Sequence, residues 1–104
     1  MSSYDINITK PAEKDLYEIA RYIANELLDY DKAAEVVDKI ANEIYKLEEM
    51  PYRNHIVDDE RLASERIRKF IIDNYIVFYV IDEEKKKVTI VRILYNRRNW
   101  IDFL

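Results

Sequence analysis

Three apolar runs close together in the C-terminal part set the strongest limit on how this chain can fold. They cover residues 67–72, 75–81 and 88–94. Each run is rich in Ile, Val, Tyr and Phe, which are side chains that favour strands. Asp73 and Asn74 separate the first two runs and suit a tight turn, and the charged residues 82–87 are long enough to close a hairpin. The sequence therefore predicts a three-stranded antiparallel meander.

The N-terminal part predicts one strand and two helices. Residues 4–9 alternate apolar and polar side chains, which is the pattern of a half-buried strand. Apolar residues then recur at steps of three and four through 12–27 and again through 33–47, which is the spacing of amphipathic helices. Pro11 suits a first helical turn, and Pro51 ends the second helix because proline has no backbone N–H to donate. The short loop between the helices predicts an antiparallel pair packed on the sheet.

These elements together predict an α+β fold in one domain, residues 1–104, since a chain of 104 residues suits a single core. The predicted sheet is antiparallel and consists of the first strand and the meander, with the helical hairpin on one face. A short C-terminal helix is expected after the last strand. Its apolar residues Trp100, Phe103 and Leu104 are expected to fold back on the core.

The composition excludes several kinds of site. The chain has no cysteine, so a disulfide, a thiolate metal site and a cysteine nucleophile are excluded, and it has no glycine for a glycine-rich phosphate loop. The single histidine, His55, lies near the acidic residues 58–60 without a second imidazole to complete a common ligand set. We therefore expect no metal and no cofactor. No signal peptide or membrane span is recognisable, so we expect a cytoplasmic protein without a membrane partner.

The net charge of −4 hides an uneven distribution. Residues 1–63 carry 8 basic and 15 acidic side chains, a net −7, whereas residues 64–104 carry 9 and 6, a net +3. In the basic part, cationic and aromatic side chains alternate along the predicted sheet: Arg66, Arg68, Lys69, Tyr75, Tyr79, Arg92, Tyr95, Arg97 and Arg98. Such a surface suits phosphates, bases or an acidic partner. The alternative is ordinary surface arginines with packed sheet tyrosines, and the sequence leaves it open.

Several segments resemble the RelE/ParE toxin family of bacterial type II toxin–antitoxin modules. They are DLYEIARYIA, the end of the second helix at LEEMP, IRKFIIDNYIVFYVID and VTIVRILYNRRNW. The resemblance covers nearly the whole chain and implies the small α+β fold already predicted. It also implies a toxin that arrests growth, serves plasmid stabilisation, and is held in a hetero-oligomer by an antitoxin that neutralises it.

The resemblance implies two activities between which the family divides. RelE-type members cut messenger RNA in the ribosomal A site without a metal. If the chain is such a ribonuclease, its candidate catalytic residues are Arg66, Arg68 and Arg98, which match the RelE-type pattern, and Tyr75. Two positions depart from that pattern, because Tyr75 stands where the RelE type has an arginine and Leu104 where it has a tyrosine.

ParE-type members poison DNA gyrase and perform no chemistry, so their site is a binding surface. On that reading, or for binding the antitoxin, the expected contacts are Arg68, Lys69, Tyr79, Arg92, Tyr95, Arg97 and Arg98. The long helical hairpin and its acidic outer faces favour the ParE type, since acidic surfaces repel ribosomal RNA. A third hypothesis is a chain that has lost toxicity and only binds its antitoxin.

Overall fold

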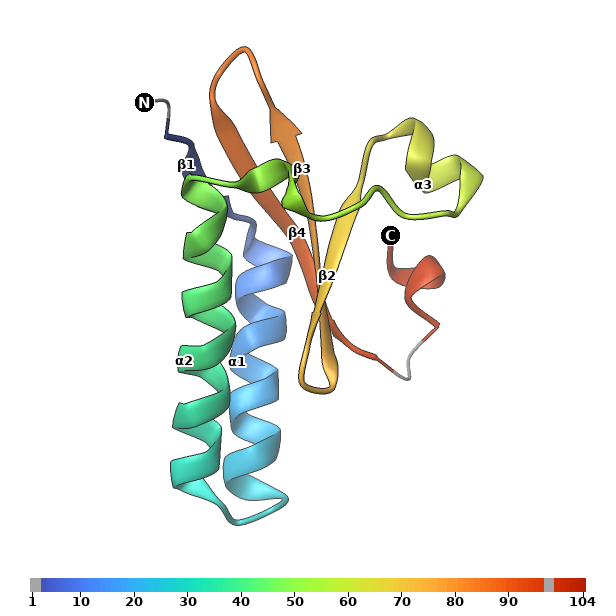
Figure 1. The fold of residues 1–104 in the computed structure, drawn as a ribbon. Helices are drawn as coiled ribbons and strands as arrows, with labels where there is room; N and C mark the ends of the chain where they lie inside the picture. Colours follow the sequence, from blue (N-terminus) through green and yellow to red (C-terminus); the bar gives the residue numbers. More distant parts are fainter. Residues whose placement is uncertain (1–2, 97–98) are drawn as a thin grey trace.

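The computed structural model describes residues 3–96 and 99–104 and shows a three-layer α+β fold. Its helices and strands are β1 (Asp5–Ile8), α1 (Lys10–Asn25), α2 (Tyr30–Tyr45), α3 (Glu60–Ser64), β2 (Arg68–Ile72), β3 (Tyr75–Asp82) and β4 (Lys87–Tyr95). Short 3₁₀ turns follow α2, namely η1 (Lys46–Glu48) and η2 (Pro51–Arg53), and a third, η3 (Trp100–Phe103), forms the predicted C-terminal helix. Figure 1 shows the α1–α2 hairpin on one side of the sheet, with α3 and the C-terminal turn on the other.

The sheet has the strand order β1-β4-β3-β2, and the predicted antiparallel meander is confirmed. β1, however, pairs with β4 in parallel, which corrects the expectation that the whole sheet is antiparallel. The cause is the helical hairpin, which returns the chain to the end of the sheet where β1 begins (Figure 1). β2 therefore runs in the same direction as β1. The β2–β3 and β3–β4 hairpins each reverse the chain, so β4 is again parallel to β1.

Turn residues and helix caps lie at the ends of the predicted helices and strands. Asp73 takes a left-handed backbone angle, φ 51°, at the predicted β2–β3 turn, and Lys86 does the same at the β3–β4 turn. Aspartate tolerates this conformation better than most residues in a chain that has no glycine. Thr9 accepts a hydrogen bond from the Ala12 N–H and caps α1, and Asp29 caps α2.

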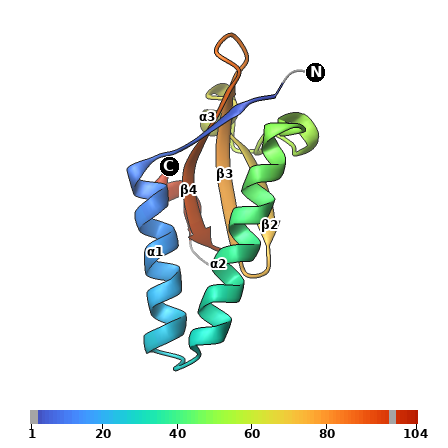
Figure 2. The same cartoon turned by 90° about the vertical axis from the view of Figure 1, so that its left-hand side faces the viewer.

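Two apolar cores lie on the two faces of the sheet. The first, between sheet and hairpin, includes Ile23, Ile40, Ile44 and Val77. In Figure 2 the two helices lie side by side on this face, with α1 nearer β4 and α2 nearer β2. None of the helices formed by the described residues is long and apolar enough to cross a membrane.

The second core is covered by a segment that the sequence analysis left irregular. α3 interrupts that segment, begins at the cap Asp59 and buries Leu62 fully. Trp100 and Leu104 pack on this core as predicted, whereas Phe103 stays 40% exposed. The sheet is therefore covered on both faces, and its basic side chains emerge only at edges and ends.

Candidate functional site

The basic side chains of β2 do not share one surface. Neighbouring residues of a strand point to opposite faces. Arg68 lies opposite Tyr79, which belongs to the core under the hairpin, and Lys69 lies opposite Phe78 of the second core. Arg66 precedes the strand, is exposed and has φ 59°. The predicted basic surface is thus divided between the two faces.

Arg68 is held at one end of the sheet by groups from η2 and the loop after it. One guanidinium nitrogen donates to the Asn54 carbonyl at 2.6 Å, and the guanidinium carbon lies 5.0 Å from the centre of the Tyr52 ring. A cation over an aromatic face is attracted by the ring's negative face. These contacts orient Arg68 and occupy part of its hydrogen-bonding capacity.

Tyr79 is a core residue. Its side chain is fully buried, and its hydroxyl donates to the Pro51 carbonyl at 2.6 Å and accepts from the Asn54 amide at 3.2 Å. Burial raises the pKa of Tyr79 because the phenolate would be poorly solvated there. A buried ring offers no surface to a partner, so Tyr79 is left out of the contacts proposed below.

Glu83, in the β3–β4 turn, lies at the centre of a polar cluster that was not predicted from the sequence. Its carboxylate accepts hydrogen bonds from Tyr4 at 2.8 Å and Tyr52 at 2.7 Å, and it pairs with Lys86. Hydrogen bonds from Lys86, Tyr52 and Tyr4 lower the pKa of Glu83 to about 2, because they stabilise the charged form. The same contact with Glu83 raises the pKa of Tyr4 and Tyr52.

We expect this cluster to make stability depend on pH in the acid range. The folded pKa of Glu83 lies at about 2, below the ordinary value of 4.5, so its contribution is complete above pH 4.5 and is lost as pH falls toward 2. Glu83→Gln should therefore narrow the stability difference between pH 6 and pH 3, measured by urea unfolding. The exposed neighbour Glu84→Gln is the matched control, and equal pH dependence in both variants would contradict the prediction.

Arg92 forms an ion pair with Asp15 of α1 beside the edge of β4. Its Nε and one terminal nitrogen donate to the two carboxylate oxygens at 2.6 and 2.8 Å, and the side chains of Arg92 and Asp15 are only 22% and 10% exposed. The Ile93 N–H also donates to this carboxylate, at 3.0 Å. β1 stops pairing with β4 at Ile90, so Asp15 satisfies a strand edge that has no neighbouring strand there.

Basic side chains also hold the C-terminal segment on the second face. The Lys69 ammonium lies 5.1 Å from the centre of the Trp100 ring, which packs 5.2 Å from the ring of Phe78. Arg61 donates to the Ile101 carbonyl at 3.3 Å, and Arg92 lies 5.6 Å from the ring centre of Phe103. Lys69 and Arg92 flank Phe78 in the strand register, and both also contact the C-terminal segment.

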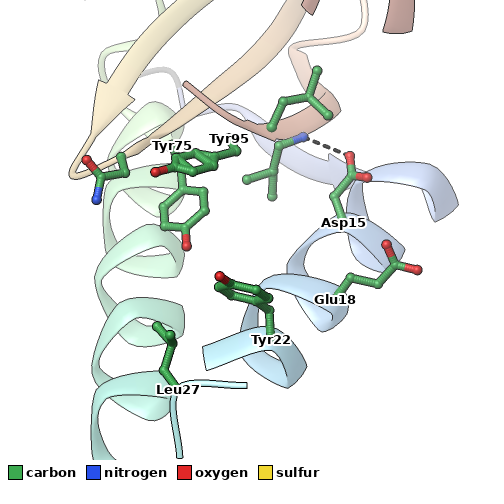
Figure 3. A pocket seen from close by; sticks show the side chains of 9 residues that line it. Asp15, Glu18, Tyr22, Leu27, Tyr75 and Tyr95 are labelled. Carbon is green, nitrogen blue, oxygen red and sulfur yellow. Dashed lines mark hydrogen bonds between the residues drawn. The ribbon is translucent and has the colours of Figure 1, made fainter. Parts of the chain in front are cut away.

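Tyr75 and Tyr95 meet at the other end of the sheet, with ring centres 5.7 Å apart. They border a groove of about 590 Å³ between α1 and the ends of β3 and β4, shown in Figure 3. We call it the tyrosine groove; its lining residues are Asp15, Glu18, Tyr22, Leu27, Asn74, Tyr75, Ile93, Leu94 and Tyr95. Burial raises the pKa of Tyr75, and neighbouring Tyr95 and Tyr22 add to the rise. Tyr75 is therefore a weak candidate for a base at neutral pH.

Two predicted site residues, Arg97 and Arg98, lie outside the described residues. Within the described ranges, no group of three or more His, Asp or Glu side chains could hold a metal ion. Sequence reasoning missed Asp15, Asn54 and Glu83. Asp15 lies 77 positions from Arg92, and no local pattern distinguishes it from the other acidic residues on a helix surface.

The structure defines a class of small α+β proteins with basic and aromatic side chains along the sheet. A family model described as ParE toxin of the type II toxin–antitoxin system parDE matches residues 6–100, and the chain belongs to this family. It is a type II toxin of the RelE/ParE superfamily, as the sequence predicted. No curated protein matches the chain.

Solved structures from this superfamily share the fold at low sequence identity. A chain of the chromosomal ParDE system of P. aeruginosa is 18% identical with a TM-score of 0.73, covering 89% of this chain and 96% of its own. A chain of the RelBE2 toxin–antitoxin complex of Mycobacterium tuberculosis is 22% identical with a TM-score of 0.67, covering 91% and 93%. A mutant of E. coli toxin RelE in the free state is 12% identical with a TM-score of 0.67, covering 97% and 92%.

Proposed function

We propose that this toxin is a ParE-like DNA gyrase poison, neutralised by a cognate antitoxin. The family model that matches nearly the whole chain is that of a ParE toxin. The site is then a binding surface, and no side chain takes part in a chemical reaction. A RelE-like ribonuclease is the competing function, and the arrangement of its candidate catalytic residues supports the ParE-like proposal.

The observation that carries the proposal is the distance between those candidate residues. Arg68 faces Tyr79 at one end of the β2–β3 ladder, and Tyr75 faces Ile72 at the other end. Tyr75 and Tyr79 are four positions apart on one strand, which places them about 13 Å apart. Groups that move a proton and stabilise charge on one phosphate must lie within hydrogen-bond reach of it. This spacing argues against one catalytic site that contains both Arg68 and Tyr75.

Charge also supports the proposal. The helical hairpin lies within residues 1–63, whose net charge of −7 opposes binding to the phosphate backbone of ribosomal RNA. The cations instead come from the sheet and the C-terminal segment. We propose as contacts of target or antitoxin the residues Arg68, Lys69, Arg92, Tyr95, Arg97 and Arg98. The antitoxin would complement them with carboxylates and apolar anchors.

The test is a pair of assays on one preparation of purified chain, gyrase supercoiling and cleavage of messenger RNA on programmed ribosomes. We expect supercoiling to be inhibited and the RNA to stay intact. Ribosome-dependent cuts would overturn the proposal in favour of the ribonuclease. Activity in neither assay, together with harmless expression in a host, would indicate a chain that only binds its antitoxin.

We expect Arg98→Ala to reduce toxicity on induced expression at least tenfold. The reason is that a cation in a contact surface acts through binding, whereas substitutions away from the core typically change stability by about 0.5 kcal/mol. Lys85→Ala, in the exposed β3–β4 turn, is the matched control and should leave toxicity unchanged. A fall in melting temperature as large as that of a core truncation would make Arg98 a structural residue instead.

A further inference from the structure

The tyrosine groove lies between the acidic helical hairpin and the basic sheet, and its described lining carries no cation. No Lys or Arg side chain is among its lining residues. Two carboxylates, from Asp15 and Glu18, lie along one wall, and three phenol rings come from α1, β3 and β4. Figure 3 shows Tyr75 and Tyr95 above Tyr22 at one end of the groove and the carboxylates toward the other.

The carboxylates of Asp15 and Glu18 differ in the partners that they contact directly. Asp15 is neutralised by Arg92 and by the Ile93 N–H. Glu18 is exposed, and its charge acts on the same Arg92 guanidinium that is already paired with Asp15. Two carboxylates thus share one guanidinium, so the described residues in and beside the groove carry a net negative charge next to aromatic rings.

This combination favours a positively charged side chain. Ring faces of tyrosine attract cations, and the attraction strengthens where water is partly excluded. Guanidinium suits the groove better than ammonium, because its plane stacks on aromatic rings while its fork of N–H donors can reach a carboxylate and phenol oxygens. Leu27 and Ile93 add apolar wall for the methylene stem of such a side chain.

We infer that the tyrosine groove binds an arginine side chain of the antitoxin, stacked on the tyrosines and paired with Glu18. The inference rests on the proposed function, which supplies the antitoxin. The occupant fits by charge, because the described lining of the groove has two carboxylates and no cation. It also fits by position, since the groove borders Ile93, Leu94 and Tyr95, where β4 pairs with β3 alone among the described strands.

The first experiment tests the groove without the antitoxin. ¹⁵N-labelled toxin is titrated with N-acetyl-arginine amide and with N-acetyl-citrulline amide, an uncharged molecule of nearly the same shape. We expect the arginine probe to shift the amide signals of Glu18, Tyr22 and Tyr95 with millimolar affinity, and citrulline to bind at least fivefold more weakly. Glu18→Gln and Tyr22→Leu should abolish the difference, and Tyr45→Leu, an exposed tyrosine of α2 outside the groove, should keep it. Equal shifts with both probes would overturn the cation preference.

The second experiment measures the affinity of the purified cognate antitoxin for the same variants. We expect Glu18→Gln to raise the Kd roughly tenfold, and an unchanged Kd would overturn the assignment of the groove to the antitoxin while leaving the proposed function standing. An antitoxin that fails to bind the wild-type chain would overturn the proposed function and the antitoxin as occupant. The arginine probe would still decide the cation preference of the groove.

Discussion

Replacing Tyr79 by alanine is expected to lower the free energy of unfolding by about 4 kcal/mol, the largest effect we predict. The ring is fully buried in the core between sheet and hairpin, so truncation leaves a cavity where surrounding side chains relax only in part. The lost hydroxyl also leaves the Pro51 carbonyl without its donor. Urea unfolding followed by circular dichroism measures the change.

Tyr79→Phe separates the two contributions, because it keeps the ring and removes only the hydroxyl. It should cost about 1 to 2 kcal/mol. Tyr45→Ala is the exposed control and should stay within about 0.5 kcal/mol of the wild type. A Tyr79→Ala protein of near wild-type stability that no longer binds gyrase or antitoxin would show instead that Tyr79 is a contact residue.

The second large effect is expected for Asp15→Ala, which should lower the free energy of unfolding by about 3 kcal/mol. Removing this carboxylate leaves the partly buried Arg92 guanidinium without its partner. It also frees the Ile93 N–H at an edge of the sheet that has no neighbouring strand. The same urea unfolding assay measures the loss, with Glu35→Ala on the exposed face of α2 as control.

A double-mutant cycle with Arg92→Ala tests the cause of this loss. If the ion pair dominates, the stability losses of the two single variants should add up to more than the loss of the double variant, by over about 1 kcal/mol. Additive losses would mean that Asp15 acts through the strand edge or through α1 rather than through Arg92. Either result bears on the site, since an Arg92 tied to Asp15 must exchange that partner before it can contact a target.

The elements that could be read from the sequence are those with a long, regular pattern. The strand predicted at residues 75–81 is observed at Tyr75–Asp82, and the turn at Asp73 has the left-handed angle its residue type allows. α3 escaped prediction because five residues are too few to show a helical period. The direction of β1 relative to its neighbour was not predicted correctly, because an alternating pattern indicates which face of a strand is buried but not which strand it pairs with.

The positions of the candidate site residues followed less directly from the sequence than the fold did. Arg68 and Lys69 were grouped as one surface, whereas the pleat of β2 sends them to opposite faces. Tyr75 and Tyr95 do meet, but at the far end of the sheet from Arg68. The sequence shows which residues are basic or aromatic. Which of them lie together in space depends on the register of the strands.

The sequence alone determined the two long helices and the strands of this toxin, because side-chain periodicity and turn chemistry act over a few residues, and its motifs indicated the family. Only the tertiary structure decided that Asp15 meets Arg92 across 77 positions and that Tyr22 joins Tyr75 and Tyr95 in one groove. Such contacts follow from how the hairpin packs on the sheet. That packing minimises exposed apolar area over the whole chain at once, so no local segment contains the information.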